Sequence, residues 1–291
     1  MPARTVDRPV SAGAFTALIV GNVMLAIGPW FVRLSDVGPV ATGFWRLSLA
    51  LPFLFAIAAV SQHRAGTLRI PAKLWALGAL AGLFFAVDLS TWHAGILHTK
   101  LANATLFGNV SSFFFAGYGF LIARTWPGRW QGIAIALAAV GTALLLGRSY
   151  ELSPENLFGD LLCLGAGLAY TGYMITVERT RLSLGTWPTL AFATLIAAMA
   201  LLPAAWLIEG RLMPDHWWPL FTLAISSQLI GQGLLVYSIG ALPPVVVGLG
   251  LLSQPLVAAA IGWAVFGERL TAGDVIGALA IAAALVLVRK R

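Results

Sequence analysis

Two charged residues lie within long apolar stretches of this chain, where charge is costly. Arg46 falls about six residues into the apolar run 40–60, and Asp88 about eight residues before the end of the run 74–96. In a membrane helix these positions are about 9 Å and 12 Å from the same side. A charge in hydrocarbon costs roughly 2.5–3.5 kcal/mol, so such groups pair or face a water-filled cavity. Three interpretations follow: an Arg46–Asp88 ion pair between helices, extension of the Arg46 side chain to the outer membrane interface, or contact of Asp88 with a charged group of a small molecule.

Uncharged polar residues recur at helical spacing on several apolar runs. Asn109 and Ser112 share one helix face, and Gln228 and Gln232 are one turn apart on another. Any one of these could simply join helices, as amide and small side chains do in membranes. Several helices with such faces together favour a shared polar cavity. The candidate substrate-binding residues are Asn22, Asp88, Trp92, Asn109, Ser112, Tyr170, Tyr173, Gln228, Gln232 and Gln254.

Aromatic residues within the runs divide into two groups. Tyr hydroxyls and Trp N–H groups require hydrogen-bond partners inside a membrane, which favours Trp92, Tyr170 and Tyr173 as cavity residues. Phe113, Phe114 and Phe115 have no such requirement and are expected to face lipid.

The sequence carries no signature of catalysis or of a bound cofactor. It has no G-x-x-x-x-G-K-[ST] phosphate loop, no H-E-x-x-H zinc motif and no G-x-S-x-G nucleophile elbow. A single cysteine, Cys163, provides neither a disulfide framework nor a multi-cysteine metal site. We therefore expect no catalytic residues, no metal and no cofactor.

Composition indicates that the solvent of this chain is lipid. Of 291 residues, 59% are hydrophobic and 10% charged, whereas soluble domains carry about 25% charged residues. The net charge of +7 is spread over short loops and forms no nucleic-acid-binding patch. A span needs about 20 mainly apolar residues. Ten candidate spans follow: 13–34, 40–60, 74–96, 101–123, 130–147, 157–177, 187–208, 217–239, 243–266 and 272–288.

The two halves of the chain carry similar landmarks 145 positions apart. Trp92 corresponds to Tyr237 (237 − 92 = 145), and Asn109 to Gln254 at the same offset. Duplication of five spans inverts the second copy in the bilayer, and inverted repeats of this kind build a midplane site open to either side in turn. We predict two repeats, 1–147 and 148–291. The predicted fold is an all-α polytopic membrane protein with ten transmembrane helices in two inverted five-helix repeats around a central cavity.

The charge of the loops predicts the orientation. With both termini in the cytoplasm, twelve of the 18 Lys and Arg residues lie inside and five outside, with Arg46 in a span. Positively charged loops remain cytoplasmic. We expect a multi-pass protein of the cell inner membrane with both termini cytoplasmic.

Several short motifs resemble those of a known family. The residues are Phe44-Trp45-Arg46-Leu47, Ser253-Gln254-Pro255-Leu256, Phe266-Gly267-Glu268-Arg269-Leu270-Thr271 and Gly277. With ten spans, they resemble the drug/metabolite transporter superfamily, EamA type, over nearly the whole chain. In overall appearance the chain looks most like the YddG-type aromatic amino-acid exporters. The first half departs from the pattern, because Val110 and Ala123 stand where the repeat would place the proline and glutamate. The resemblance implies a central cavity and alternating access without ATP.

The leading hypothesis is a secondary transporter that exports small amphipathic metabolites by alternating access, amino acids including aromatic ones being the first class. The alternatives are a broad-specificity drug/metabolite or sugar-type carrier and a non-transporting membrane scaffold. An intramembrane enzyme would require converging catalytic groups. The expected partners are a small-molecule substrate and the lipid bilayer, without nucleic acid, and the chain could act as a monomer.

Overall fold

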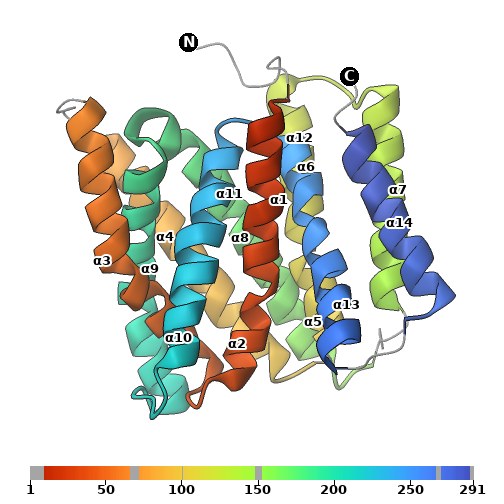
Figure 1. Ribbon diagram of the computed structural model, residues 1–291. Helices are drawn as coiled ribbons and strands as arrows, with labels where there is room; N and C mark the ends of the chain where they lie inside the picture. Colours follow the sequence, from red (N-terminus) through yellow and green to blue (C-terminus); the bar gives the residue numbers. More distant parts are fainter. Residues whose placement is uncertain (1–9, 66–71, 100, 148–152, 267–269, 289–291) are drawn as a thin grey trace.

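The computed structural model describes residues 10–65, 72–99, 101–147, 153–266 and 270–288, which contain helices and short connections but no strand (Figure 1). In order, the helices are α1 (Ala12–Ala26), α2 (Gly28–Leu34), α3 (Pro39–Ala65), α4 (Ala72–Ile96), α5 (Leu101–Gly108), α6 (Val110–Ala123), α7 (Arg129–Gly147), α8 (Leu157–Leu184), α9 (Thr186–Glu209), α10 (Trp218–Leu223), the π-helix η2 (Ala224–Gly231), α11 (Gln232–Ile239), α12 (Pro244–Leu251), α13 (Ser253–Phe266) and α14 (Ala272–Leu287).

These helices confirm the ten predicted spans. Within the described residues, eight helical segments are long and apolar enough to cross a membrane, and two shorter apolar helices, Arg129–Leu145 and Ala272–Leu287, complete the set. A helix satisfies its own backbone groups where no water is available, which explains why apolar runs of this length fold this way. The predicted end of the sixth span at residue 177 was too early. Glu178 is buried, and α8 continues past it to Leu184.

The second half runs opposite to the first. The start of α1 and the end of α14 lie on one face of the bundle, which we call the terminal face (Figure 1). The end of α4 and the start of α8 lie on the opposite, distal face, where Thr99 donates a hydrogen bond to Asp160 at 2.6 Å. Five crossings separate the start of α1 from the start of α8, so corresponding helices point in opposite directions.

Packing between the halves follows the repeat. Helix α3 packs on α9, α6 on α12 and α7 on α14, each a contact between corresponding spans. The contact of α1 with α11 corresponds to that of α8 with α4, because exchange of the halves converts span 1 into span 6 and span 8 into span 3. The helix pairs therefore obey a pseudo-two-fold relation. The predicted boundary at 147/148 adjoins residues 148–152, which lie outside the described residues, and it stays a prediction.

Glycines allow two of these helix pairs to approach closely. A Cβ on Gly141 of α7 would lie 2.7 Å from the carbonyl oxygen of Gly277 on α14. Conversely, a Cβ on Gly277 would lie 2.7 Å from the carbonyl oxygen of Gly141. On α12, a Cβ at Gly248 would lie 2.4 Å from the Ser112 carbonyl oxygen of α6. Since lipid is as apolar as leucine, membrane helices associate through such close backbone packing.

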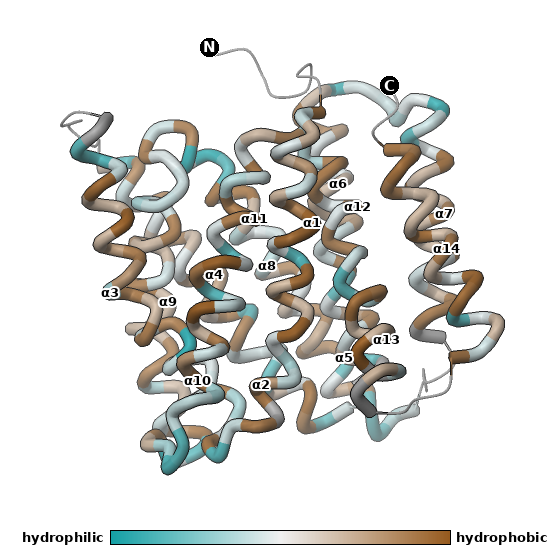
Figure 2. Tube along the Cα trace, in the orientation of Figure 1, coloured by the Kyte–Doolittle hydropathy of each residue, from teal (hydrophilic) through white to brown (hydrophobic). Residues whose placement is uncertain are grey.

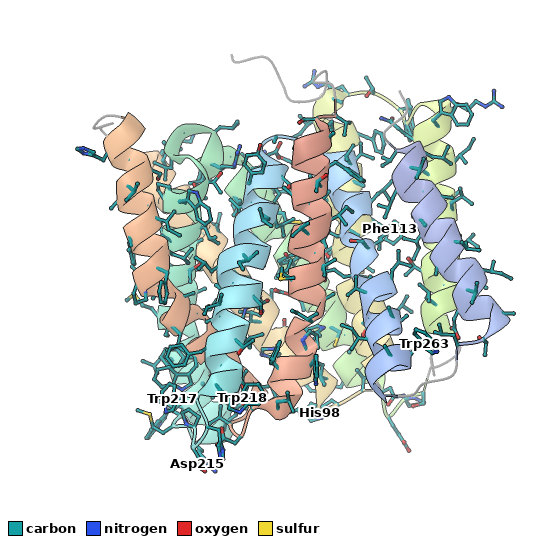
Figure 3. The ribbon with its side chains drawn as sticks, viewed as in Figure 1. His98, Phe113, Asp215, Trp217, Trp218 and Trp263 are labelled. Carbon is teal, nitrogen blue, oxygen red and sulfur yellow. The ribbon has the colours of Figure 1, made fainter. Side chains whose placement is uncertain are left out.

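The outer surface of the bundle is apolar. Large hydrophobic side chains such as Leu121, Met199 and Leu207 are exposed on the protein, and Figure 2 shows hydrophobic residues along the helices, with hydrophilic residues gathered near the loops. At the distal face, Trp217 and Trp218 lie near Asp215 (Figure 3), where an aromatic belt is expected. One expectation was wrong: Phe115 is fully buried and Phe113 packs against the core, so only Phe114 of the three faces outward.

Gly277→Leu is expected to lower the melting temperature of the detergent-solubilised protein, because the side chain would force α14 away from the Gly141 carbonyl. Overpacking of this kind costs about 1–3 kcal/mol. Gly132→Leu is the matched control, since a Cβ at Gly132 meets nothing within 4 Å. Equal melting temperatures of the two variants would contradict close α7–α14 packing.

Candidate functional site

Several of the spans are broken or irregular near the middle of the bundle. The first is interrupted at Ile27, just before Gly28 and Pro29, and the ninth at Leu252, with Pro255 in the first turn of the following helix. The fourth is interrupted at Asn109, and the eighth contains the π-helix η2. Proline removes a helical hydrogen bond, and π-helices are frequent at functional sites. These breaks release backbone groups inside the bundle, which side chains or a ligand must satisfy.

At the break in the ninth span, the amides predicted on spans 1 and 9 meet. The Asn22 side-chain nitrogen donates to the carbonyl oxygen of Gly250 at 2.9 Å, and the Gln254 side-chain nitrogen donates to the Asn22 oxygen at 3.1 Å. The Ser253 hydroxyl donates to the same Gly250 carbonyl at 2.8 Å. Asn22 is fully buried. In this conformation, Asn22 and Gln254 hold α1 against the broken helix.

The break in the fourth span has its own amide. The Asn109 side-chain nitrogen donates to the carbonyl oxygen of Thr105 at 2.8 Å, one turn back on α5. Ser112 is buried, and its hydroxyl lacks a hydrogen-bond partner. Trp92 of α4 lies close by: a Cβ at Gly108 would be 3.3 Å from the indole nitrogen. These three predicted residues therefore line one region where α4 meets the end of α5.

Three stacked rings and one amide form a second group, which we call the aromatic cluster: Phe85 on α4, Tyr170 and Tyr173 on α8, and Gln232 on α11. The ring centroids of Phe85 and Tyr173 are 4.7 Å apart, and those of Tyr170 and Tyr173 are 5.6 Å apart. The Tyr173 hydroxyl donates to the Gln232 oxygen, and the Gln232 nitrogen donates to the Tyr170 hydroxyl, both at 3.4 Å. One amide thus connects both tyrosines across helices of the second half, against Phe85 of the first.

The π-helix η2 carries a second amide side chain, that of Gln228, four residues before Gln232. The fully buried Gln228 donates to the hydroxyl of Thr194 on α9 at 2.9 Å, while its side-chain oxygen has no partner. Buried polar atoms without partners are rare in proteins. Gln228 therefore keeps an unused acceptor in the interior of the bundle.

Arg46 and Asp88 lie beside the aromatic cluster. The guanidinium carbon of Arg46, on α3, is 5.9 Å from the centroid of the Phe85 ring. Asp88 follows Phe85 by one turn on α4, on the same side of that helix. In this conformation the two charged groups form no direct ion pair, and Arg46 Nε has no hydrogen-bond partner. The predicted ion pair between them thus stays a prediction that this conformation does not show.

The structure thus brings the predicted residues together in three groups. Tyr170, Tyr173 and Gln232 meet in the aromatic cluster, with Asp88 one turn after Phe85 on α4. Asn22 pairs with Gln254, and Trp92, Asn109 and Ser112 lie around the fourth-span break, whereas Gln228 stands apart on η2.

Sequence reasoning missed three contributors to these groups: Phe85, Thr194 and His93. Nothing in the sequence distinguishes Phe85 from the adjacent Phe84, or Thr194 from Thr189 in the same span. His93 lies near the end of a predicted span and belongs to no metal-binding motif, yet it is buried, and its Nδ1 has no hydrogen-bond partner among the described residues. A Cβ on Gly43, three residues before Arg46, would lie 3.2 Å from the His93 ring.

Two further acidic residues are buried within a span, which corrects the expectation that Arg46 and Asp88 were the only charges inside spans. Asp160 of α8 accepts hydrogen bonds from Thr99 and from the Asn103 side chain at 3.0 Å. Glu178 lies near the other end of the same helix. Both lie near an end of α8, where the sequence alone does not distinguish a buried charge from one in a loop.

Comparison with known proteins identifies the family. The model of the EamA-like transporter family matches residues 12–147 and again 157–290. The chain belongs to this family. It is a multi-pass membrane transporter rather than an enzyme, which confirms the resemblance to the drug/metabolite transporter superfamily. The narrower resemblance to YddG-type exporters stays a prediction.

Relatives of this EamA-like transporter include exporters. It is 31% identical over 155 residues to the threonine/homoserine exporter RhtA of Salmonella typhimurium strain SL1344, and 31% over 153 residues to RhtA of Escherichia coli K12. The matches cover 52% of this chain and about half the length of each relative. An uncharacterized transporter of Archaeoglobus fulgidus is 24% identical over 186 residues, covering 63% of this chain and 62% of that protein. A chain of known crystal structure shares the fold, with a TM-score of 0.76 at 17% identity, covering 94% of this chain and 95% of the other.

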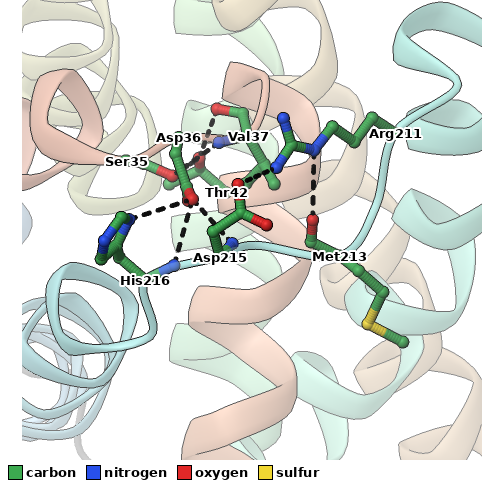
Figure 4. A network of polar contacts seen from close by, with 8 residues as sticks. All are labelled: Ser35, Asp36, Val37, Thr42, Arg211, Met213, Asp215 and His216. Carbon is green, nitrogen blue, oxygen red and sulfur yellow. Dashed lines mark hydrogen bonds and ion pairs between the residues drawn. The ribbon is translucent and has the colours of Figure 1, made fainter.

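On the distal face of this EamA-like transporter, a polar contact ties the two halves together (Figure 4). Asp36, in the loop after α2, accepts hydrogen bonds from the backbone N–H groups of Asp215 at 2.6 Å and His216 at 3.0 Å. Arg211 forms an ion pair with Asp215 at 2.6 Å. We call this the distal loop contact. It joins the loop between α2 and α3 to the segment between α9 and α10.

A second tie lies next to the distal loop contact. The carboxylate of Glu209, the last residue of α9, accepts hydrogen bonds from the backbone N–H groups of Val40 at 2.7 Å and Ala41 at 2.8 Å, at the start of α3. These are donors that a helix leaves unsatisfied in its first turn. An acidic group there also complements the helix dipole. The indole nitrogen of Trp45 donates to the Leu212 carbonyl oxygen at 2.6 Å.

The charge of Asp36 makes the distal loop contact dependent on pH. Desolvation on its own would raise the pKa of Asp36, but the hydrogen bonds from Asp215 and His216 outweigh it, and the net pKa is lowered. A carboxylate of lowered pKa stabilises the contact above its ordinary value of about 3.9, and the contribution is lost as the pH falls through the lower value. The contact is therefore fully formed at neutral pH.

Asp36→Ala is expected to accelerate amide hydrogen exchange of the segment 211–218 at neutral pH, because the N–H groups of Asp215 and His216 lose their acceptor. Hydrogen-exchange mass spectrometry of the protein in nanodiscs measures this. Glu155→Ala, at another exposed acidic residue, is the control and should leave that segment unchanged. Unaltered exchange in Asp36→Ala would show that the distal loop contact does not protect these amides.

Proposed function

We propose that this EamA-like transporter exports small neutral amino acids, aromatic ones included, across the cell inner membrane by alternating access. The observation that carries the proposal is the aromatic cluster, in which Gln232 bridges Tyr170 and Tyr173 beside Phe85. The cluster is built from both halves of the chain, as a site between inverted repeats should be.

The hydrogen bonds of the aromatic cluster suit a site that exchanges partners. Both bonds of Gln232 measure 3.4 Å, beyond the usual range of 2.7–3.2 Å. A substrate amide, hydroxyl or carboxylate can replace such long bonds at little cost. The tyrosine and phenylalanine rings offer stacking surfaces, and a stacked aromatic pair contributes about 0.5–1.5 kcal/mol beyond area burial. An amphipathic amino acid matches both properties.

The relatives support the amino-acid class and the direction. RhtA proteins are described as exporters of threonine and homoserine. Both are small neutral amino acids with a hydroxyl group, for which Gln232, Tyr170 and the unused oxygen of Gln228 are suitable hydrogen-bond partners. The stacked rings extend the proposed range to aromatic side chains.

Alternating access requires a contact that opens on each side. On the distal face, the distal loop contact joins the loop after α2 to the segment before α10, and the bonds that cross it end on one carboxylate, that of Asp36. The interruptions at Ile27, Asn109 and Leu252 provide points at which spans can bend without unfolding. We propose that the distal face is periplasmic, since positively charged loops gather on the terminal face, and that both termini are cytoplasmic.

Counterflow in proteoliposomes tests the proposal. Preloaded L-phenylalanine or L-threonine should accelerate entry of the labelled amino acid at least about tenfold over protein-free liposomes. Gln232→Leu should reduce that rate about tenfold, a loss of ~1.4 kcal/mol, because it leaves two tyrosine hydroxyls without their bridging amide. Gln131→Leu, on α7 away from the cluster, is the matched control and should retain wild-type flux.

The outcomes separate the rival functions. Flux of sugars or cationic drugs but not of amino acids would replace the proposal by a broad-specificity carrier. No flux of any solute by folded protein would favour a scaffold. Equal flux in Gln232→Leu and wild type would show that the aromatic cluster does not contribute to transport.

A further inference from the structure

The bundle holds two opposite charges next to the same aromatic ring. The guanidinium carbon of Arg46, on α3, lies 5.9 Å from the centroid of Phe85, and Asp88 follows Phe85 by one turn on α4. They nevertheless form no ion pair in this conformation, and no described residue donates a hydrogen bond to the Asp88 carboxylate. Among the described residues, the buried Arg46 Nε has no hydrogen-bond partner, and the guanidinium carbon lies over the face of the Phe85 ring at 5.9 Å.

Such an arrangement is costly unless something completes it. An unpaired charge at membrane depth is unfavourable, and a guanidinium is best satisfied by a carboxylate that accepts two parallel hydrogen bonds. A direct Arg46–Asp88 pair would satisfy both residues and leave nothing for a ligand. Because the pair is not closed, each charge keeps its capacity for a group of opposite sign.

We propose that Arg46 and Asp88 form a zwitterion subsite, in which Arg46 binds the carboxylate of an amino-acid substrate and Asp88 its ammonium group. The inference rests on the proposed function and specifies which residues select the substrate class. It also changes the role of Arg46 from structural partner to substrate contact.

The surroundings of the two charges support this division. Asp88 follows Phe85 of the aromatic cluster by one turn on α4, so an ammonium group at Asp88 places the substrate side chain near the stacked rings. Among the described residues, the buried Nδ1 of His93 has no hydrogen-bond partner. His93 packs on Gly43, on the same helix as Arg46. A carboxylate at Arg46 therefore has a second polar neighbour.

The subsite explains selectivity by charge. A zwitterion neutralises both residues at once, whereas an amine alone leaves Arg46 unpaired and a carboxylate alone leaves Asp88 unpaired. A buried charge that loses its partner is strongly destabilising. The subsite thus favours molecules that carry both charges on neighbouring atoms, while the aromatic cluster tolerates different side chains.

Three ligands that share one ring and differ in charge test the proposal: L-phenylalanine, 2-phenylethylamine and 3-phenylpropionate. Competition with labelled L-phenylalanine counterflow and ligand-induced thermal shifts in detergent give apparent affinities. Wild type should bind L-phenylalanine at least about tenfold more tightly than either singly charged ligand, which corresponds to ~1.4 kcal/mol.

Removal of either charge should shift the preference for L-phenylalanine towards one of the singly charged ligands, and the two variants should shift it in opposite directions. Arg46→Gln leaves Asp88 alone and should shift the preference about tenfold towards 2-phenylethylamine. Asp88→Asn should shift it equally towards 3-phenylpropionate. Arg46→Lys, which keeps the charge, should retain most of the zwitterion preference. Arg129→Gln, at an exposed arginine stacked on Trp130, is the control and should bind like wild type.

A purely structural role would lower the affinity for all three ligands alike, and unchanged ratios in the folded variants would overturn the subsite while the transport proposal stands. If Arg46→Gln or Asp88→Asn does not fold, the wild-type ratios decide, because equal affinities for the three ligands would overturn the subsite. If the wild-type protein transports no amino acid, this result would instead contradict the proposed function itself.

Discussion

The constraint on which this structure depends is the lack of water at membrane depth. Backbone N–H and C=O groups there must find partners within the protein, so each apolar run forms a helix, and each interruption requires a dedicated side chain. Asn22 and Ser253 satisfy the Gly250 carbonyl, and Asn109 satisfies that of Thr105. The same rule makes a polar atom without a partner conspicuous, and Arg46, Ser112 and Gln228 carry such atoms in the interior where we propose that a substrate binds.

The architecture could be predicted from sequence because its signals are long and repeated. Ten apolar runs, an offset of 145 residues and the bias of basic loops all reflect sums over many residues, and the helices appear where these sums place them. The ends of the helices were harder to predict. Glu178 resembles a loop residue in the sequence, yet α8 continues past it to Leu184. Whether a charge at the end of a run is buried depends on neighbouring helices, which no local pattern contains.

The candidate site was predicted in part for a related reason. Polar residues stand out in an apolar run, so Tyr170, Tyr173 and Gln232 could be selected, although their contact could not. Phe85 is one phenylalanine among 16, and only the packing of α4 on α8 distinguishes it. The π-helix around Gln228 has no signature in the sequence, and it departs from the repeat, because the equivalent part of α4 is a regular α-helix.

The carboxylate of Glu209, which satisfies the first turn of α3, has a mechanical consequence. It fastens the last turn of a helix from the second half to the opening turn of a helix from the first, and the two also pack along their lengths. Helices α3 and α9 are therefore coupled, and a movement of one would carry the other. Arg46 lies on α3 and Asp88 on α4, so a displacement of the α3–α9 pair against α4 would alter the distance between the two charges.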